Sequence, residues 1–195
     1  MNSTYIFFGR SGAGKGTQAQ LLKEQLEKQG RTVKYIETGA AFRTFIESDS
    51  FAAKKAKEQM AKGELLPEFL PIWMWADFLI KNVSGDEDLI LDGLARRPHE
   101  APILDSALRF FGRTNVHIIY VNVSIDWATE RLMARGRADD HIDEIKKRLT
   151  WFDWNVVPSM AYFHELPQYK FHDINGEQTI EAVHTEITKS IENRI

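Results

Sequence analysis

Hydrophobic residues gather in five short runs along the chain, and longer stretches of mixed polarity separate them. Short uninterrupted apolar runs are typical of strands that are buried on both faces, as in a parallel sheet. The five predicted strands are Tyr5–Phe8, Val33–Ile36, Leu89–Leu91, Val116–Val121 and Tyr169–Ile174.

The stretches between these runs favour helices. Residues 18–29 place Leu21, Leu22 and Leu26 on one face of a helix, and an apolar stripe at helical spacing runs from Ile180 to Ile191. Strands that alternate with helices predict an α/β fold, a doubly wound five-stranded parallel sheet with helices on both faces. Ligands of such sheets bind beyond the carboxyl ends of the strands, where we expect the functional site.

Two stretches interrupt this alternation. Residues 40–83 are too long for one crossover and predict three helices, with breaks at residues 47–50 and 63–67. Residues 134–143 form a short charged break between helices, and binding loops or lids are often carried by a rigid sheet in this way. We therefore expect a single domain, residues 1–195, with a core of residues 1–37, 84–133 and 144–195, a helical insert at 38–83 and a very short lid at 134–143.

The clearest chemical signal is a glycine-rich loop between the first strand and the first helix. It reads Gly9-Arg10-Ser11-Gly12-Ala13-Gly14-Lys15-Gly16-Thr17. Glycines let the backbone turn its N–H groups inward, and the helix that begins near Lys15 points its positive end at the same place. Lys15 adds a full charge that can follow the β- and γ-phosphates of a nucleotide. Strand, glycine loop and helix in this order predict a phosphate-binding loop, or P-loop.

Composition excludes several other classes of function. The net charge of −3 argues against a general binder of nucleic acid or membrane surfaces, which would show a basic field. The chain has no cysteine, so disulfides and thiolate zinc sites are excluded. The sequence shows neither a signal peptide nor an apolar run near the roughly 20 residues of a membrane span. We expect a cytoplasmic protein that acts as a monomer.

The loop pattern Gly-x-x-Gly-x-Gly-Lys-Gly-Thr-Gln resembles that of the adenylate kinase family of nucleoside monophosphate kinases. Further motifs of that family follow in the expected order and extend the resemblance over nearly the whole chain. They are Thr38-Gly39 with Arg43, Gly63-Glu64-Leu65-Leu66-Pro67, Leu91-Asp92-Gly93-Leu94-Ala95-Arg96, and the arginines Arg131, Arg135, Arg137 and Arg148. The resemblance implies Mg²⁺-dependent phosphoryl transfer from ATP to a nucleoside monophosphate (NMP), with AMP as the first candidate.

The resemblance also assigns residues to the two nucleotides. The ATP site would comprise Gly12, Ala13, Gly14, Lys15, Gly16, Thr17, Arg131, Arg135 and Gln178. The acceptor site would comprise Thr38, Gly39, Arg43, Glu64, Leu65, Leu66, Gly93, Arg96, Glu100, Arg137 and Arg148. The groups that stabilise the transferring phosphoryl would be Lys15, Arg96, Arg135, Arg137 and Arg148. Asp92, which ends an apolar strand, would hold Mg²⁺ through water.

Glu100 departs from this pattern in an informative way, because the adenylate-specific members carry Gln at its spacing. A Gln amide can donate to N1 of adenine and accept from its N6 amino group, whereas an ionised Glu can only accept. Guanine presents two donors on that edge, N1–H and the N2 amino group. Glu100 therefore favours GMP, unless it pairs with Arg96 or Arg97, or takes up a proton, and leaves AMP preferred.

Two alternatives stand beside an AMP kinase. One is an NMP kinase with another acceptor, either GMP or a pyrimidine nucleotide. The other is a nucleotide-binding regulator that does not turn over. The departures at Ser11, Ala40, Ala95 and Glu100 favour the regulator, whereas the charged residues of the phosphate sites are all present.

Overall fold

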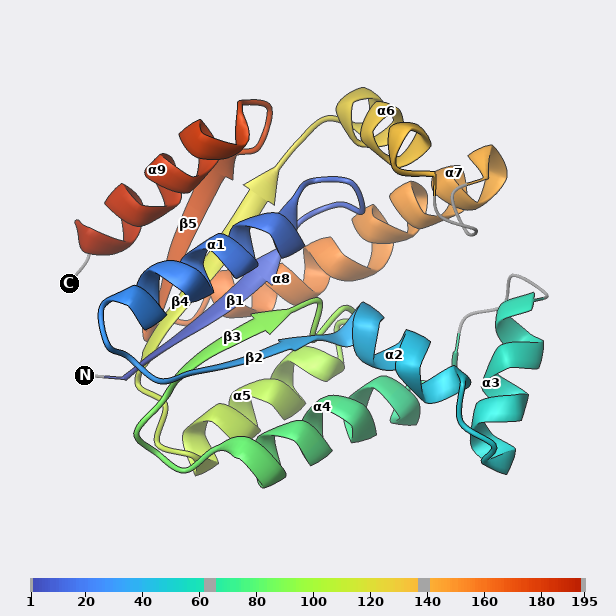
Figure 1. Cartoon of the computed structure of the whole chain (residues 1–195), viewed down its shortest axis with the longest axis horizontal. Helices are drawn as coiled ribbons and strands as arrows, with labels where there is room; N and C mark the ends of the chain where they lie inside the picture. The colour runs from blue at the N-terminus through green and yellow to red at the C-terminus, as the bar shows by residue number, and fades with distance from the viewer. Residues whose placement is uncertain (1, 62–65, 137–140, 194–195) are drawn as a thin grey trace.

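The computed structural model describes residues 2–61, 66–136 and 141–193 of the chain. Within them a sheet of five parallel strands has the order β2-β3-β1-β4-β5 (Figure 1). The strands are β1 (Ser3–Phe8), β2 (Val33–Glu37), β3 (Asp88–Asp92), β4 (Asn115–Asn122) and β5 (Tyr169–Asn175). Each predicted run lies inside one of these strands, so the doubly wound parallel sheet is confirmed.

The central strand explains why the apolar runs are continuous. β1 pairs with β3 on one side and β4 on the other, and a core cluster that includes helix residues covers each of its two faces. Alternate residues of a strand point to opposite faces. Tyr5 and Phe7 accordingly enter one core cluster, and Ile6 and Phe8 enter the other.

Helices cover both faces of the sheet. The described helices are α1 (Lys15–Lys28), α2 (Thr38–Ile46), α3 (Phe51–Ala61), α4 (Phe69–Asn82), α5 (Glu100–Phe110), α6 (Ile125–Arg135), α7 (Ile142–Trp151), α8 (Val157–His164) and α9 (Ile180–Glu192). Helices α1, α6, α7 and α9 pack on one core cluster, and α4, α5 and α8 pack on the other. None of the helices in the described ranges has the length and apolar character needed to cross a bilayer.

The region of residues 40–83 forms the three predicted helices, α2 to α4. Helix α2 begins directly after β2 at Thr38, two residues before the predicted start, and residues 47–50 separate it from α3 as expected. The second predicted break falls mostly on residues 62–65, outside the described ranges. The charged break at 134–143 also lies partly outside them: α6 ends at Arg135 with Gly136 as its C-cap, α7 begins at Ile142, and residues 137–140 are not described.

Helices α7 and α8 form one continuous rod, joined by a π-helical turn, η1 (Phe152–Val156). Ile145 and Leu149 of α7 belong to the core cluster of α1 and α9, whereas Phe152 and Val156 belong to the opposite cluster. A π turn inserts an extra residue and so rotates the helix face that follows. The turn thus lets a single helix serve both cores.

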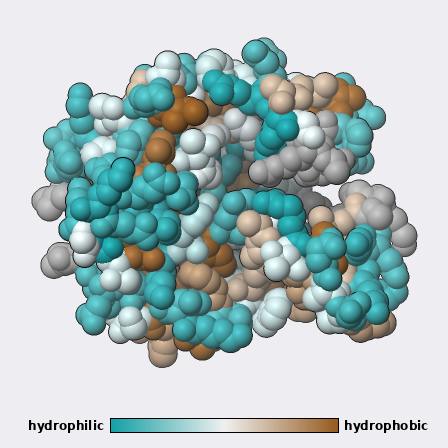
Figure 2. Space-filling view, in the orientation of Figure 1, coloured by the Kyte–Doolittle hydropathy of each residue, from teal (hydrophilic) through white to brown (hydrophobic). Residues whose placement is uncertain are grey.

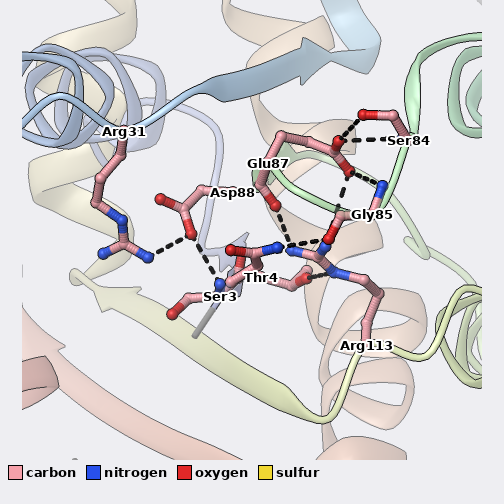
Figure 3. A network of polar contacts seen from close by, with 9 residues as sticks. Ser3, Thr4, Arg31, Ser84, Gly85, Glu87, Asp88 and Arg113 are labelled. Atoms are coloured by element: carbon pink, nitrogen blue, oxygen red, sulfur yellow. Dashed lines mark hydrogen bonds and ion pairs between the residues drawn. The ribbon is translucent and has the colours of Figure 1, made fainter.

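At the amino ends of the strands, a buried polar network ties β1 and β3 to the start of β4 (Figure 3). Arg113 is 7% exposed, and its guanidinium donates to the Thr4 hydroxyl and to the carbonyls of Ser3 and Glu87. The carboxylate of Glu87 lies 3.7 Å from this guanidinium and also accepts from the Ser84 hydroxyl. Because these donors and acceptors pair with one another, we interpret the network as structural.

Replacing Arg113 by Ala should lower the free energy of unfolding by about 3–5 kcal/mol, because the change leaves the buried carboxylate of Glu87 without its positively charged partner. Urea denaturation followed by circular dichroism measures it. Lys81→Ala, which breaks an exposed pair with Asp77, is the control and should cost less than about 1 kcal/mol. A loss at Arg113 no larger than the control would contradict the structural role of the network.

Candidate active site

A cavity of about 540 Å³ opens at the carboxyl ends of β1, β2 and β3, as the fold class predicts. Its walls come from the glycine loop after β1, from α2 and α4, from the loop between β3 and α5, and from α7 and η1. Figure 2 shows the surface hollowed between the side that carries α6 and α7 and the side that carries α2 and α3. The cavity therefore lies between the core and the segment predicted to be the helical insert, and its described wall includes no residue of the predicted lid.

The glycine loop is packed tightly against neighbouring backbone. A Cβ atom at Gly9 would lie 2.5 Å from the carbonyl oxygen of Val121, and one at Gly12 would lie 2.6 Å from that of Ala128. Gly14, with φ 86°, is the N-cap of α1. The loop thus requires glycine for close approach and for left-handed backbone, and it leads into the positive end of a helix.

Lys15 is folded back into the loop. Its ammonium donates to the carbonyls of Gly9 and Arg10, at 2.8 and 2.9 Å. Burial lowers the pKa of Lys15 to about 8, and the nearby Asp92 carboxylate opposes that shift. The cation is thus held at the place where an anion would bind.

Asp92 ends β3 beside the first turn of α1. It is buried, and burial raises its pKa, while Lys15 and Arg96 act in the opposite direction. A Cβ at Gly16 would contact its Oδ2 at 3.5 Å. The described residues contain no cluster of three His, Cys, Asp or Glu side chains able to hold a metal. A single carboxylate fits Mg²⁺, which keeps several waters and takes phosphate oxygens of its substrate as ligands.

Arg96 and Arg148 line the cavity from different segments of the chain, and Arg97 lines it beside Arg96. Arg96 lies in the β3–α5 loop, and a Cβ at Gly93 would be 2.3 Å from its Nη2 atom, so the guanidinium can fold there only over a glycine. Arg148 lies on α7, and its Nε donates to the carbonyl of Glu144 at 3.4 Å. Together with Lys15, Arg96 and Arg148 bring cations from three separate segments to one cavity.

Three other residues predicted for the ATP site, Arg131, Arg135 and Gln178, are not among the described residues that line the cavity. Arg135, at the end of α6, is near enough to Lys15 to lower its pKa. The guanidinium of Arg131 lies 4.7 Å from the ring centroid of Trp127, and the amide of Gln178 donates to Glu186 at 2.6 Å. The predicted residue Arg137 lies outside the described ranges.

The predicted acceptor residues are partly assembled. Thr38 and Gly39 line the cavity, and the Thr38 hydroxyl donates to the carbonyl of Asp92 at 3.4 Å. Arg43 instead pairs with Glu37 at 3.0 Å and is not among the described residues of the cavity wall. The carbonyl of Leu66, another predicted acceptor residue, accepts from Arg97 at 2.9 Å. Glu64 and Leu65 lie outside the described ranges.

Glu100 begins α5 and lines the cavity while being only 3% exposed. Its Oε2 atom accepts from the backbone N–H of Arg96 at 3.1 Å. Burial raises the pKa of the Glu100 carboxyl, while that hydrogen bond and the positive charge of Arg97 act to lower it. One carboxylate oxygen of Glu100 is therefore already hydrogen-bonded to the backbone of the loop that carries Arg96.

The structural role of Arg10 was not predicted from the sequence. Its guanidinium pairs with Asp153 of η1 at 2.7 Å, donates to the carbonyl of Val123 at 3.1 Å and lies 4.8 Å from the ring centroid of Phe152. These contacts fasten the glycine loop to the helix that carries Arg148. A charged side chain inside the glycine motif was the available signal, but its partner is distant in sequence.

Glu144 and Lys147 of α7, which form an ion pair at 2.9 Å, also line the cavity and were not predicted. Their hydrogen bond lowers the pKa of Glu144 and raises that of Lys147. Their spacing in the sequence is typical of an ion pair on the exposed face of a helix.

Comparison with known proteins gives a consistent result. A sequence model of the family described as adenylate kinase matches residues 7–167. The chain is 36% identical to adenylate kinase 1 of Synechocystis over 190 residues, which cover 95% of each chain. It is 32% identical to the adenylate kinase of Flavobacterium johnsoniae over 194 residues, covering 96% of this chain and 97% of the relative. It is 30% identical to adenylate kinase 1 of Nostoc over 186 residues, covering 95% and 97%.

The pairing of Arg10 with Asp153 should be measurable as an energetic coupling. In a double-mutant cycle of Arg10→Ala and Asp153→Ala, we expect the free energies of unfolding to be non-additive by about 0.5–1 kcal/mol, because Asp153 is partly exposed. The exposed pair of Lys55 and Glu58 is a control with coupling close to zero. Additive effects at Arg10 and Asp153 would show that the contact does not fasten the loop.

Proposed function

The chain belongs to the adenylate kinase family, and we propose that it catalyses the reversible transfer of the γ-phosphoryl group of Mg·ATP to AMP, giving two ADP. Adenylate kinase homologues are phosphotransferases, and the family likeness supports nucleoside monophosphate kinase activity. The observation that carries the proposal is the convergence of Lys15, Arg96 and Arg148 on one cavity from three separate segments.

The donor would bind along the glycine loop. Phosphate oxygens can accept from the loop N–H groups and from the first turn of α1, where the helix end is positive. Lys15 would exchange the carbonyls of Gly9 and Arg10 for phosphate oxygens, whose negative charge favours the charged form of Lys15 that burial disfavours. Arg135, near Lys15, would add charge over the same phosphates.

The acceptor would bind between α2 and the β3–α5 loop, with Thr38, Gly39 and Arg96 around its phosphate. Transfer forms a bond between the γ-phosphorus and an acceptor phosphate oxygen, and breaks the bond from that phosphorus to the β–γ bridging oxygen. The attacking oxygen is already anionic, so no general base is required. The protein's contribution is positioning and charge stabilisation, which Lys15, Arg96 and Arg148 can supply.

Asp92 is the residue that would hold Mg²⁺, through water, beside the glycine loop. The metal would neutralise charge on the β- and γ-phosphates during transfer. Arg137, Glu64 and Leu65 keep the roles that the family resemblance implies as predictions. A monomeric state and a cytoplasmic location also stay predictions.

Glu100 supports GMP as a second acceptor. Its buried carboxylate lines the cavity, and an ionised carboxylate can accept from both donors of the guanine edge. Because Oε2 already accepts from Arg96, and burial raises the pKa of the group, we propose that AMP stays the better substrate and that Glu100 weakens discrimination against GMP.

A coupled assay of ADP formation with Mg·ATP, tested against AMP, GMP, CMP, UMP and dAMP with a no-acceptor control, tests the function. We expect AMP to give the highest kcat/KM, with measurable turnover of GMP. Turnover that does not depend on any acceptor, or none at all, would contradict a kinase and favour a nucleotide-binding regulator.

In the same panel, Glu100→Gln should raise the AMP-to-GMP ratio of kcat/KM about tenfold, because the amide can donate to N1 of adenine and loses one acceptor for guanine. Glu68→Gln, whose carboxylate pairs with His99, is the matched control and should leave the ratio unchanged. Lowering the pH should shift the wild type toward AMP as well, since protonated Glu100 can donate. An unchanged ratio in Glu100→Gln would leave this carboxylate only a structural role.

A further inference from the structure

We propose that Ser159, on α8, is a positioning residue for Arg96 and acts through the peptide group that joins Ala95 to Arg96. The proposal rests on the proposed function, because Arg96 is taken to hold the acceptor phosphate. Nothing in the sequence singles out Ser159, which lies in a mainly apolar helix and is fully buried.

The backbone at Ala95 is strained. Ala95 has φ 49°, and among the described residues it is the one non-glycine with a positive φ. A side chain in this left-handed region carries a steric cost, and such conformations persist only where surrounding contacts hold them. Ala95 lies directly before Arg96, so the contact that holds it also sets where the arginine begins.

The 95–96 peptide group is held at both of its polar ends. The Ser159 hydroxyl donates to the carbonyl of Ala95, and the N–H of Arg96 donates to Glu100 at 3.1 Å. A peptide group is planar, so two hydrogen bonds on its opposite sides fix its orientation. Glu100 supplies one bond from the acceptor side of the cavity, and Ser159 supplies the other from α8.

The fixed peptide directs the side chain of Arg96. From this backbone the guanidinium folds over Gly93, where a Cβ would lie 2.3 Å from Nη2, so this placement depends on the glycine. Rotation of the 95–96 peptide would carry the guanidinium away from Gly93 and from the cavity. Ser159 also lies on the same continuous helical rod as Arg148. The hydrogen bond to Ala95 therefore links the backbone before Arg96 to the helical rod that carries Arg148.

Without the hydroxyl, the carbonyl of Ala95 would lose this donor in a place where the residue is fully buried. A buried carbonyl without a donor is costly, and the strained loop would relax toward ordinary backbone. Ser159→Ala should raise the KM for AMP about tenfold and lower kcat, while the KM for Mg·ATP changes less than about twofold.

Two further variants separate positioning from general stability. Tyr162→Phe removes another hydroxyl of α8, which donates to Asp105 at 3.2 Å away from the loop, and should lower stability without changing either KM. Ala95→Gly placed in Ser159→Ala should restore the KM for AMP, because glycine adopts the left-handed region without the anchor. An unchanged KM in Ser159→Ala, or failure of Ala95→Gly to restore a raised one, would overturn the proposal.

Amide hydrogen exchange of the ligand-free protein tests the same contact, and this measurement does not depend on catalytic activity. The Arg96 amide should exchange about tenfold faster in Ser159→Ala and at the wild-type rate in Tyr162→Phe. Equal rates in all three proteins would overturn the positioning role. An inactive wild-type protein with faster exchange in Ser159→Ala would instead contradict only the proposed function. If Ser159→Ala does not fold, Ser159→Cys can replace it, because a thiol is a weaker hydrogen-bond donor than a hydroxyl. It should raise the KM for AMP and the exchange rate of the Arg96 amide by smaller factors.

Discussion

The concentration of positive charge at the carboxyl ends of the strands is the constraint on which the site depends. Lys15, Arg96 and Arg148 face one cavity, and like charges brought together this closely repel. The structure offsets the repulsion with carbonyls around Lys15 and with the buried carboxylate of Asp92. Burial still lowers the pKa of Lys15, and the charges of Arg96 and Arg135 act in the same direction. An anionic ligand would favour the charged form of Lys15, which supports the proposal that this cavity binds phosphate.

The scaffold keeps these charges in place through contacts that carry no chemistry. Glycines let the loop lie against the backbone of Val121 and Ala128, and Arg10 fastens it to η1. At the far ends of the strands, Arg113 ties β1, β3 and β4 together. The rod of α7, η1 and α8 links both sides of the cavity, because it carries Arg148 and also contacts the loop before Arg96. Rigid contacts at the amino ends of the strands thus help to keep the charged side chains in position at the carboxyl ends.

The sequence predicted what depends on local pattern. The strands, the three helices of the 40–83 region and the glycine loop follow from runs and spacings of neighbouring residues, and the structure confirms them. It did not predict contacts between residues far apart in the chain, such as Arg10 with Asp153 or Ser159 with Ala95. Nor did it indicate that Arg43 pairs with Glu37, or that an oxygen of Glu100 is used by a backbone N–H. Those depend on which side chains the fold brings together.

The central claim is that two nucleotides occupy this cavity together, with their phosphates meeting between Lys15, Arg96 and Arg148. Isothermal titration with two adenosines joined by a five-phosphate chain tests it directly, beside titrations with ATP and AMP alone. We predict one site per chain and an affinity at least about 100-fold above that of either single nucleotide, because the linked halves bind as one molecule. An affinity no greater than that of ATP would mean that only one nucleotide binds, and would contradict the account.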